Sequence, residues 1–297
     1  MSTLRQREIR AGYLFVLPAY LIYLVFLLVP LLAALGLSFA QMDRISWTID
    51  WVGWENFDWI LGDPRFWKTF RNTFYFISFS VIGNVGLGLL VALALDRAIP
   101  GPVLYFFRLA YFLPVLVSLA FVSFIWKFLY STDLGIINYY LRQIGIENVP
   151  WLTSSSMAMI SVVIVDVWKN MGFFVIIFLA ALQGVPRNLL EAAAIDGARP
   201  FAVLTRIKVP FIAPVIVFCV TYATIGGLQV FDSIKILTDG GPGDATRSVV
   251  MYMVSEAFSA GDLGTGAASA LILLITIAFV VACQMGLVKF MQRDRSR

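Results

Sequence analysis

Long apolar segments alternate with short polar ones along the whole chain. A helix needs roughly 20 apolar residues to cross a hydrocarbon layer about 30 Å thick, and six segments are long enough to do so. They cover residues 12–38, 72–95, 103–129, 156–182, 211–236 and 265–290. This pattern predicts an all-α integral membrane protein, with six transmembrane helices in one domain over residues 1–297.

The composition agrees with a membrane protein and argues against catalysis. Hydrophobic residues make up 60% of the chain and charged residues 13%, and the mean hydropathy is +0.86. The chain has no histidine, and its two cysteines, Cys219 and Cys283, lie inside apolar segments. Neither a metal-ligand cluster nor a nucleophile with its base can be assembled from these residues. We therefore expect no catalytic residue and no metal site.

The distribution of basic residues predicts the orientation. The first apolar segment is too long for a signal peptide and is not followed by a cleavage site of small residues, so we expect it to be retained. With the N-terminus inside, thirteen Lys and Arg lie in inner segments and six in outer ones. The positive-inside rule then places both termini in the cytoplasm. The basic C-terminus QRDRSR is interpreted as a stop-transfer cluster, and no nucleic-acid partner is expected.

Two outer loops have distinctive compositions. The loop over residues 39–71 carries five tryptophans and is expected to lie along the membrane surface, partly as a short amphipathic helix; it is also a candidate docking surface for an outer partner. The sequence LTDGGPGDAT at 237–246 cannot continue a helix, so the fifth helix should end there. No GxxxxGK[ST] phosphate loop occurs, so any nucleotide would bind to another chain.

The inner segment over residues 186–210 interrupts the apolar sequence with small residues, charges and helix breakers. Good helix formers follow Pro186 and end at Gly197, and a second short helix is predicted over 201–208, before the fifth span. Alanine side chains allow close approach of another surface, and charged residues can set the register at its rim. A partner protein is one interpretation of this segment, and an ordinary helical connector is the other. The charged residues are Glu191, Asp196 and Arg199.

The same segment resembles the signature loop of permease subunits of bacterial ABC importers. The family pattern is matched by EAAAIDGA at 191–198 and by Ile207 and Pro210, with Val209 where leucine is more usual. LTDGGPGDAT at 237–246 and LGTGAASA at 263–270 resemble the carbohydrate-uptake branch. The resemblance covers nearly the whole chain and is greatest to the maltose-type and glycerol-3-phosphate-type first permease, although this chain has no large outer domain.

The resemblance implies a set of partners in the bacterial inner membrane and on both of its sides. These are a second homologous permease, a cytoplasmic ATPase dimer that binds ATP and magnesium, and an extracytoplasmic solute-binding protein; this chain itself would hold no cofactor. The helix over 191–198 would seat in the ATPase and transmit its closure. The expected ATPase-coupling residues are Glu191, Ala192, Ala193, Asp196, Gly197, Ala198 and Arg199.

Polar residues near the middle of two spans are candidates for a solute pathway. Charged side chains deep in a bilayer are costly unless they face a bundle interior or a wet cavity. In the fourth span, Asp166, Lys169, Asn170 and Phe173 share one helical face, and a ring beside amides and charges suits a sugar. The alternative is that Asp166 and Lys169 only neutralise each other between packed helices.

The fifth span adds polar groups beside a glycine pair that weakens its helix. Asp232 and Lys235 are expected to pair with each other or with an outer gate. The pathway candidates in this span are Tyr222, Gly226, Gln229 and Asp232.

These patterns together favour a transport subunit that catalyses no bond change. The principal hypothesis is an ATP-driven importer of a sugar or a similar small polar solute that works by alternating access. A stand-alone ion-coupled secondary transporter, with Asp166 or Asp232 as the coupling carboxylate, is the alternative. The sequence does not distinguish oligosaccharide, monosaccharide, polyol and glycerol phosphate.

Overall fold

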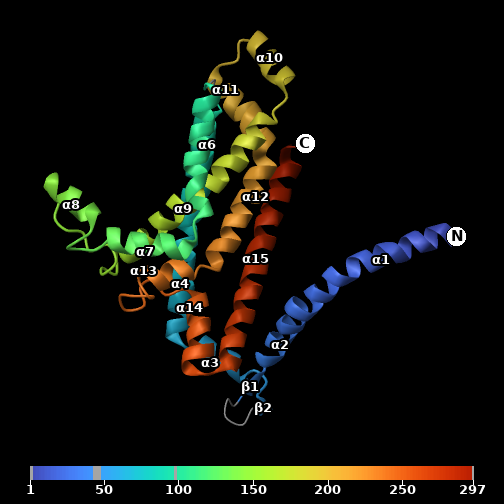
Figure 1. Ribbon diagram of the computed structural model, residues 1–297, viewed down its shortest axis with the longest axis vertical. Coiled ribbons are helices and arrows are strands. Elements are labelled where there is room, and N and C mark those ends of the chain that lie inside the picture. The colour runs from blue at the N-terminus through green and yellow to red at the C-terminus, as the bar shows by residue number, and fades with distance from the viewer. Residues whose placement is uncertain (1–2, 43–47, 97–98, 296–297) are drawn as a thin grey trace. The chain divides into compact units, whose positions relative to one another are not determined.

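The computed structural model describes residues 3–42, 48–96 and 99–295 (Figure 1). Arg44, Arg97 and Arg297, which entered the count of basic residues, lie outside the described residues, as does Trp47. Five helices in the described part are long and apolar enough to cross a membrane, and a strongly bent helix pair would make six. The chain is therefore a mostly helical, multi-pass membrane protein.

The described residues form two compact units. Unit 1 consists of residues 1–63 and 252–274, and unit 2 of residues 64–251 and 275–297. The long helix α15 (Leu263–Arg295) begins in unit 1 and continues into unit 2.

Unit 1 contains the first candidate span and a small sheet that an all-α fold did not predict. Strands β1 and β2 pair antiparallel, with Ala40 opposite Trp51 and Met42 opposite Ile49. Asn56 anchors this region, because its buried amide donates to the carbonyls of Ser38 and Ala40 at 3.1 and 3.0 Å. The expected short helix of the tryptophan-rich loop is α3. The elements are α1 (Thr3–Tyr23), η1 (Leu24–Leu28), α2 (Val29–Leu37), β1 (Ala40–Met42), β2 (Ile49–Trp51), α3 (Glu55–Gly62) and η4 (Ser255–Ala260).

Unit 2 is a helical bundle in which α9 is the central helix. Its elements before α9 (Ala158–Gln183) are α4 (Pro64–Val81), η2 (Ile82–Leu87), α5 (Gly88–Leu95), α6 (Gly101–Leu116), α7 (Leu119–Leu129) and α8 (Ile136–Gln143). The elements after α9 are α10 (Arg187–Ile195), α11 (Pro200–Val203), η3 (Leu204–Lys208), α12 (Val209–Leu228), α13 (Asp232–Leu237) and α14 (Val249–Val254), the last of which runs into unit 1. Within this unit α10 lies at one end of α9 and α12, and α13 lies toward the other (Figure 1).

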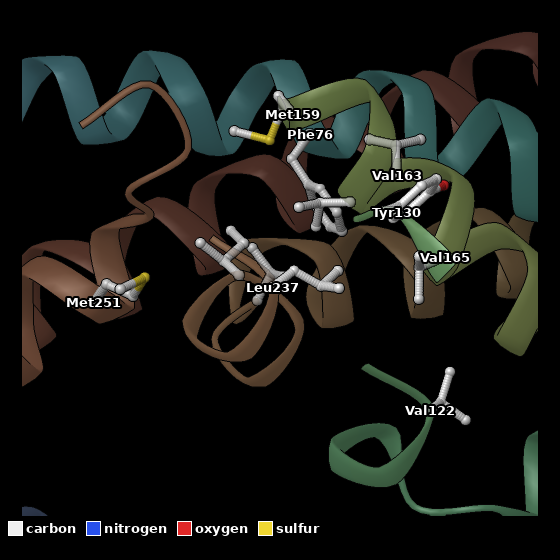
Figure 2. Packing of buried hydrophobic residues seen from close by; sticks show 11 residues of the cluster. Phe76, Val122, Tyr130, Met159, Val163, Val165, Leu237 and Met251 are labelled. Atoms are coloured by element: carbon white, nitrogen blue, oxygen red, sulfur yellow. The ribbon is translucent and has the colours of Figure 1, made fainter. Parts of the chain in front are cut away.

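Two apolar clusters hold the bundle together. One is formed by α9 with α4, α7 and α13; Figure 2 shows Phe76 of α4 beside Met159 and Val163 of α9. The other joins α9 to α5 and α12. The crossing of α9 and α6 is so close that a Cβ on Gly172 would lie 1.8 Å from the carbonyl oxygen of Tyr111. Only glycine fits at that position.

The third predicted span is not one helix. It divides at Val117 and Ser118, and α6 and α7 meet at an angle of 96°. Pro114 cannot donate a backbone hydrogen bond inside α6, and both residues of the break have extended backbone. Hydropathy over 103–129 could not reveal the break, because both helices are apolar.

The second, fourth, fifth and sixth spans differ from the prediction at their ends. The second begins already at Pro64, so residues 64–71 are helical; the fourth and sixth agree within a few residues. The short helix expected over 201–208 is continuous with the fifth span, forming one helix from Pro200 to Leu228. The π-helical turn η3 precedes Pro210 and widens the helix where a proline ring would clash. The fifth span ends at Leu228 and not at residue 236.

Candidate functional site

A cavity of about 530 Å³ in unit 2 gathers all the predicted pathway residues. Its walls come from α4 and η2, from the break between α6 and α7, from α9, and from the break between α12 and α13. The predicted residues on its walls are Asp166, Lys169, Asn170, Phe173, Tyr222, Gly226, Gln229 and Asp232. Two segments separated by nearly fifty residues therefore meet around one space.

Asp166 is the centre of a polar cluster on the cavity wall. The residue is 9% exposed, and its carboxylate accepts hydrogen bonds from Ser80, from Asn84 at 2.9 Å and from Asn170 at 2.8 Å. The first two donors lie on α4 and η2, so the cluster ties them to α9. Satisfied polar groups of this kind are required for a carboxylate inside a membrane.

Lys169 makes no ion pair with Asp166 at hydrogen-bond distance, and the alternative in which the two charges only neutralise each other stays a prediction. Its ammonium lies 3.4 Å from the Val115 carbonyl and 3.4 Å from the Asn170 side-chain oxygen. The carbonyl of Val115 is free to accept because α6 ends one residue later. The break that hydropathy missed thus supplies a partner for the lysine.

An aromatic surface lies beside this cluster. The rings of Phe173 and Tyr222 are 5.0 Å apart between centroids and tilted by 32°. Tyr222 is 52% exposed, and both residues line the cavity. Rings next to carboxylate, amide and ammonium groups can stack on the CH face of a sugar while its hydroxyls form hydrogen bonds.

The end of α12 contributes the remaining candidates. Gly226 and Gln229 lie where the helix stops, and Asp232 begins α13. The predicted pair between Asp232 and Lys235 is wrong, since Lys235 bonds to Asp239 at 2.6 Å, one turn further along. Asp239 has a positive φ of 50°, which folds it back over the end of α13. Asp232 makes no ion pair with any described residue.

Ser80, Asn84 and Ser233 line the same cavity and were not predicted. The hydroxyl of Ser233 is buried and has no hydrogen-bond partner among the described residues. The i, i+4 spacing of Ser80 and Asn84, which places both on one helical face, was an available signal. Asn84 also lies within the π-helical turn η2, a type of distortion found often at functional sites.

The predicted coupling residues lie together on α10 and the turn that follows it. All are exposed except Ala193, and the neighbouring Ile195 is 87% exposed. The helix ends in a Schellman motif, because Ala198 N donates to Ala193 O at 2.9 Å and Gly197 N to Ala194 O at 3.1 Å. Gly197 has a φ of +69°, which explains why a glycine is needed there.

A second cavity, of about 640 Å³, lies behind α10. It separates Leu190 and Ala194 from the end of α5 and from η3. On its wall, Lys208 of η3 bonds to Asp96, which follows α5, at 2.5 Å. This contact joins the base of the fifth span to the end of the second.

A family model and curated relatives all match this chain to permease components of transport systems. A family model described as "Binding-protein-dependent transport system inner membrane component" matches residues 84–297. The chain is 33% identical to the trehalose/maltose transport system permease protein of Thermococcus litoralis, over 94% of each chain. It is 32% identical to the sn-glycerol-3-phosphate transport system permease protein of Agrobacterium fabrum, over 93% of this chain and 94% of that one.

Solved structures share the fold. A chain of a bacterial ABC transporter "involved in the import of the acidic polysaccharide alginate" superposes with a TM-score of 0.86 at 22% identity, over 97% of this chain and 99% of that chain. A second structure, of the alginate transporter "in complex with alginate pentasaccharide-bound periplasmic protein", gives a TM-score of 0.82 at 22% identity, over 94% and 93% of the two chains.

Proposed function

The chain belongs to the family of binding-protein-dependent transport system inner membrane components, and on that premise we propose that it is the permease subunit of an ATP-driven importer. Its cargo is a sugar or a similar small polar solute. The proposal includes a second homologous permease, an ATPase dimer that binds ATP and magnesium, and an extracytoplasmic solute-binding protein. The observation that carries it is the family match, which spans both α10 and most of the residues around the cavity that holds Asp166.

The proposed topology has six spans with both termini in the cytoplasm. The bent pair α6 and α7 then counts as one span. The excess of basic residues in the inner segments supports this orientation. It directs α10 to the cytoplasm and the loop between α13 and α14 to the outside.

In the proposed mechanism α10 is the coupling helix. Its exposed alanines and Glu191 contact the ATPase, and the Schellman turn at Gly197 keeps the helix end rigid. Because η3 and α12 form one continuous helix with α11, a displacement of the coupling segment reaches the fifth span directly. Closure of the ATPase dimer would then rock α12 against α9 and expose the cavity alternately to each side.

The cavity of about 530 Å³ beside α9 is the proposed solute site. Phe173 and Tyr222 provide the stacking surface, and Lys169, Asn170 and Gln229 provide hydrogen-bonding groups. Asp166 positions Asn170 and has its own oxygens occupied by three donors. Because three donors already occupy its oxygens, Asp166 is a fixed part of the wall, and this favours the ATP-driven importer over a secondary transporter in which Asp166 would bind the coupling ion.

Reconstitution tests this function. The chain, its sister permease and their ATPase are placed in liposomes with the loaded binding protein outside, and uptake of a panel of labelled sugars, polyols and glycerol phosphates is measured. Uptake that requires ATP inside the liposomes is expected. Uphill uptake by this chain alone on a proton or sodium gradient would establish the secondary transporter instead.

A further inference from the structure

A third cavity, lined by several polar side chains, lies at the end of unit 2 where α4 begins. It has a volume of about 400 Å³ and is bounded by α4, by the turn before α9 and by the loop between α13 and α14. We call it the basic cup and define it by Lys68, Arg71, Ser155, Ser156 and Gly243. It shares no lining residue with the proposed solute site.

The loop that forms one wall of the cup is held in place by α4. The amide of Asn72 donates to the carbonyls of Asp244 and Arg247 at 2.8 and 3.0 Å. The Lys68 ammonium donates to the carbonyl of Gly243 at 2.7 Å. These bonds fix the loop backbone before any ligand arrives, so little ordering is required on binding.

The cup carries uncompensated positive charge. Within the described residues neither Lys68 nor Arg71 makes an ion pair. The acidic side chains of the neighbouring loop are already neutralised, since Asp244 lies 2.7 Å from Arg247 and Asp239 pairs with Lys235. The cup therefore attracts an anionic group that this unit does not itself supply.

The cup and the coupling helix lie at opposite ends of α9. Ser155, Ser156 and Met159 are at its beginning, and α10 follows its end. Twenty-six helical residues separate them, or about 39 Å. When α10 faces the cytoplasm, the basic cup faces the outer compartment.

We propose that the basic cup receives a carboxylate side chain of the extracytoplasmic binding protein. This inference rests on the proposed function, because it needs a binding-protein-dependent importer in the stated orientation. Arg71 would bind the carboxylate through its guanidinium, and the hydroxyls of Ser155 and Ser156 would complete its hydrogen bonds. The polar wall and the fixed loop favour a water-exposed protein side chain over a lipid, whose acyl chains require an apolar surface.

The complete transporter in nanodiscs tests this contact through stimulation of ATP hydrolysis by its loaded binding protein. Arg71→Gln should raise the binding-protein concentration for half-maximal stimulation about fivefold, as expected for one exposed charge pair, and Arg71→Glu should raise it further. The maximal rate should not change. High salt should reduce the difference between the variants, because it screens the attraction.

Lys127→Gln provides the matched control, since Lys127 is an exposed cation on α7 outside the cup. It should leave the half-maximal concentration unchanged. If Arg71→Gln also leaves it unchanged, the docking contact is refuted while the proposed function stands. If wild-type transporter is not stimulated by any binding protein, the proposed function itself fails.

Two further results would replace the docking contact with another ligand. An activity that depends on Arg71 only in nanodiscs containing phosphatidylglycerol would assign the cup to a lipid headgroup. An Arg71→Gln effect confined to the solute concentration dependence, at saturating binding protein, would assign it to an anionic solute.

Discussion

Lys208 and Asp96 form an ion pair across 112 residues of sequence, with their side-chain atoms 2.5 Å apart and side-chain exposures of 23% and 13%. The pair joins η3, at the base of the fifth span, to the residue that follows α5. In the proposed mechanism, a displacement of α10 and α11 would reach the fifth span through η3 and the second span through this pair.

Removal of this pair should weaken both stability and coupling. A partly buried pair lies between the surface and interior cases, so Asp96→Asn or Lys208→Gln should cost about 1 kcal/mol. Thermal unfolding of the purified complex and the ratio of solute transported to ATP hydrolysed measure the two effects. Exchange of the charges, Asp96→Lys with Lys208→Asp, should restore part of both.

Asp239→Asn is the control for that experiment. It breaks the more exposed pair with Lys235, and asparagine accepts the positive φ of this position. Neither stability nor coupling should change. Equal losses in this variant would mean that the Lys208–Asp96 pair has no particular role.

Substitution at Gly197 should separate backbone strain from the contact with a partner. Apart from its chain neighbours, a Cβ there would meet no atom of the described residues within 4 Å, so the cost within the chain comes from its φ of +69°. Gly197→Ala should destabilise the end of α10 by about 1 kcal/mol, and Gly197→Asn by less. Co-purification of the ATPase with Gly197→Asn tests the contact, which should be lost although the helix end is retained.

Phe173→Ala should raise the solute concentration needed for half-maximal uptake by about tenfold, since it removes one face of the aromatic surface. Phe218→Ala is the matched control, because Phe218 stacks on the same tyrosine but does not line the cavity. Uptake measured with both variants in proteoliposomes tests whether the Phe173 ring contacts the solute. Equal effects of the two would remove α9 from the solute site.

Gly172→Ala should prevent normal packing of α6 on α9. The added methyl would collide with the Tyr111 carbonyl, and backbone must move to relieve it, at a cost of about 1 to 3 kcal/mol. The yield and melting temperature of the purified complex are expected to fall. Gly286→Ala in α15 should lower neither, because apart from its own helix no described atom lies within 4 Å of its Cβ.

Five of the six predicted spans coincide with helices that are long and apolar enough to cross a membrane, but the breaks were not predicted. The fourth span, predicted over 156–182, is seen over Ala158–Gln183 because its apolar length alone determines it. The bend after Leu116 and the end of α12 at Leu228 depend on Pro114, on the Gly226–Gly227 pair and on packing around them. A hydropathy average has the same value for a straight and a broken helix.

The charged residues of the candidate site were predicted from the sequence, and its uncharged polar residues were missed. Asp166 and Lys169 are conspicuous in an apolar sequence, because a membrane penalises them strongly. Ser80 and Asn84 carry no charge, and their partner lies more than eighty residues away. Their importance becomes visible only when α9 brings the carboxylate beside them.

The Schellman turn of α10 also bears on how an assembly would form. Its hydrogen bonds are made entirely by the backbone of this chain, so the helix needs no partner to complete its end. An ATPase that docks there would bind a helix end that is already ordered, so little conformational entropy would be lost on binding. Formation of the complex would then be limited by diffusional encounter, and its lifetime by the quality of the contact.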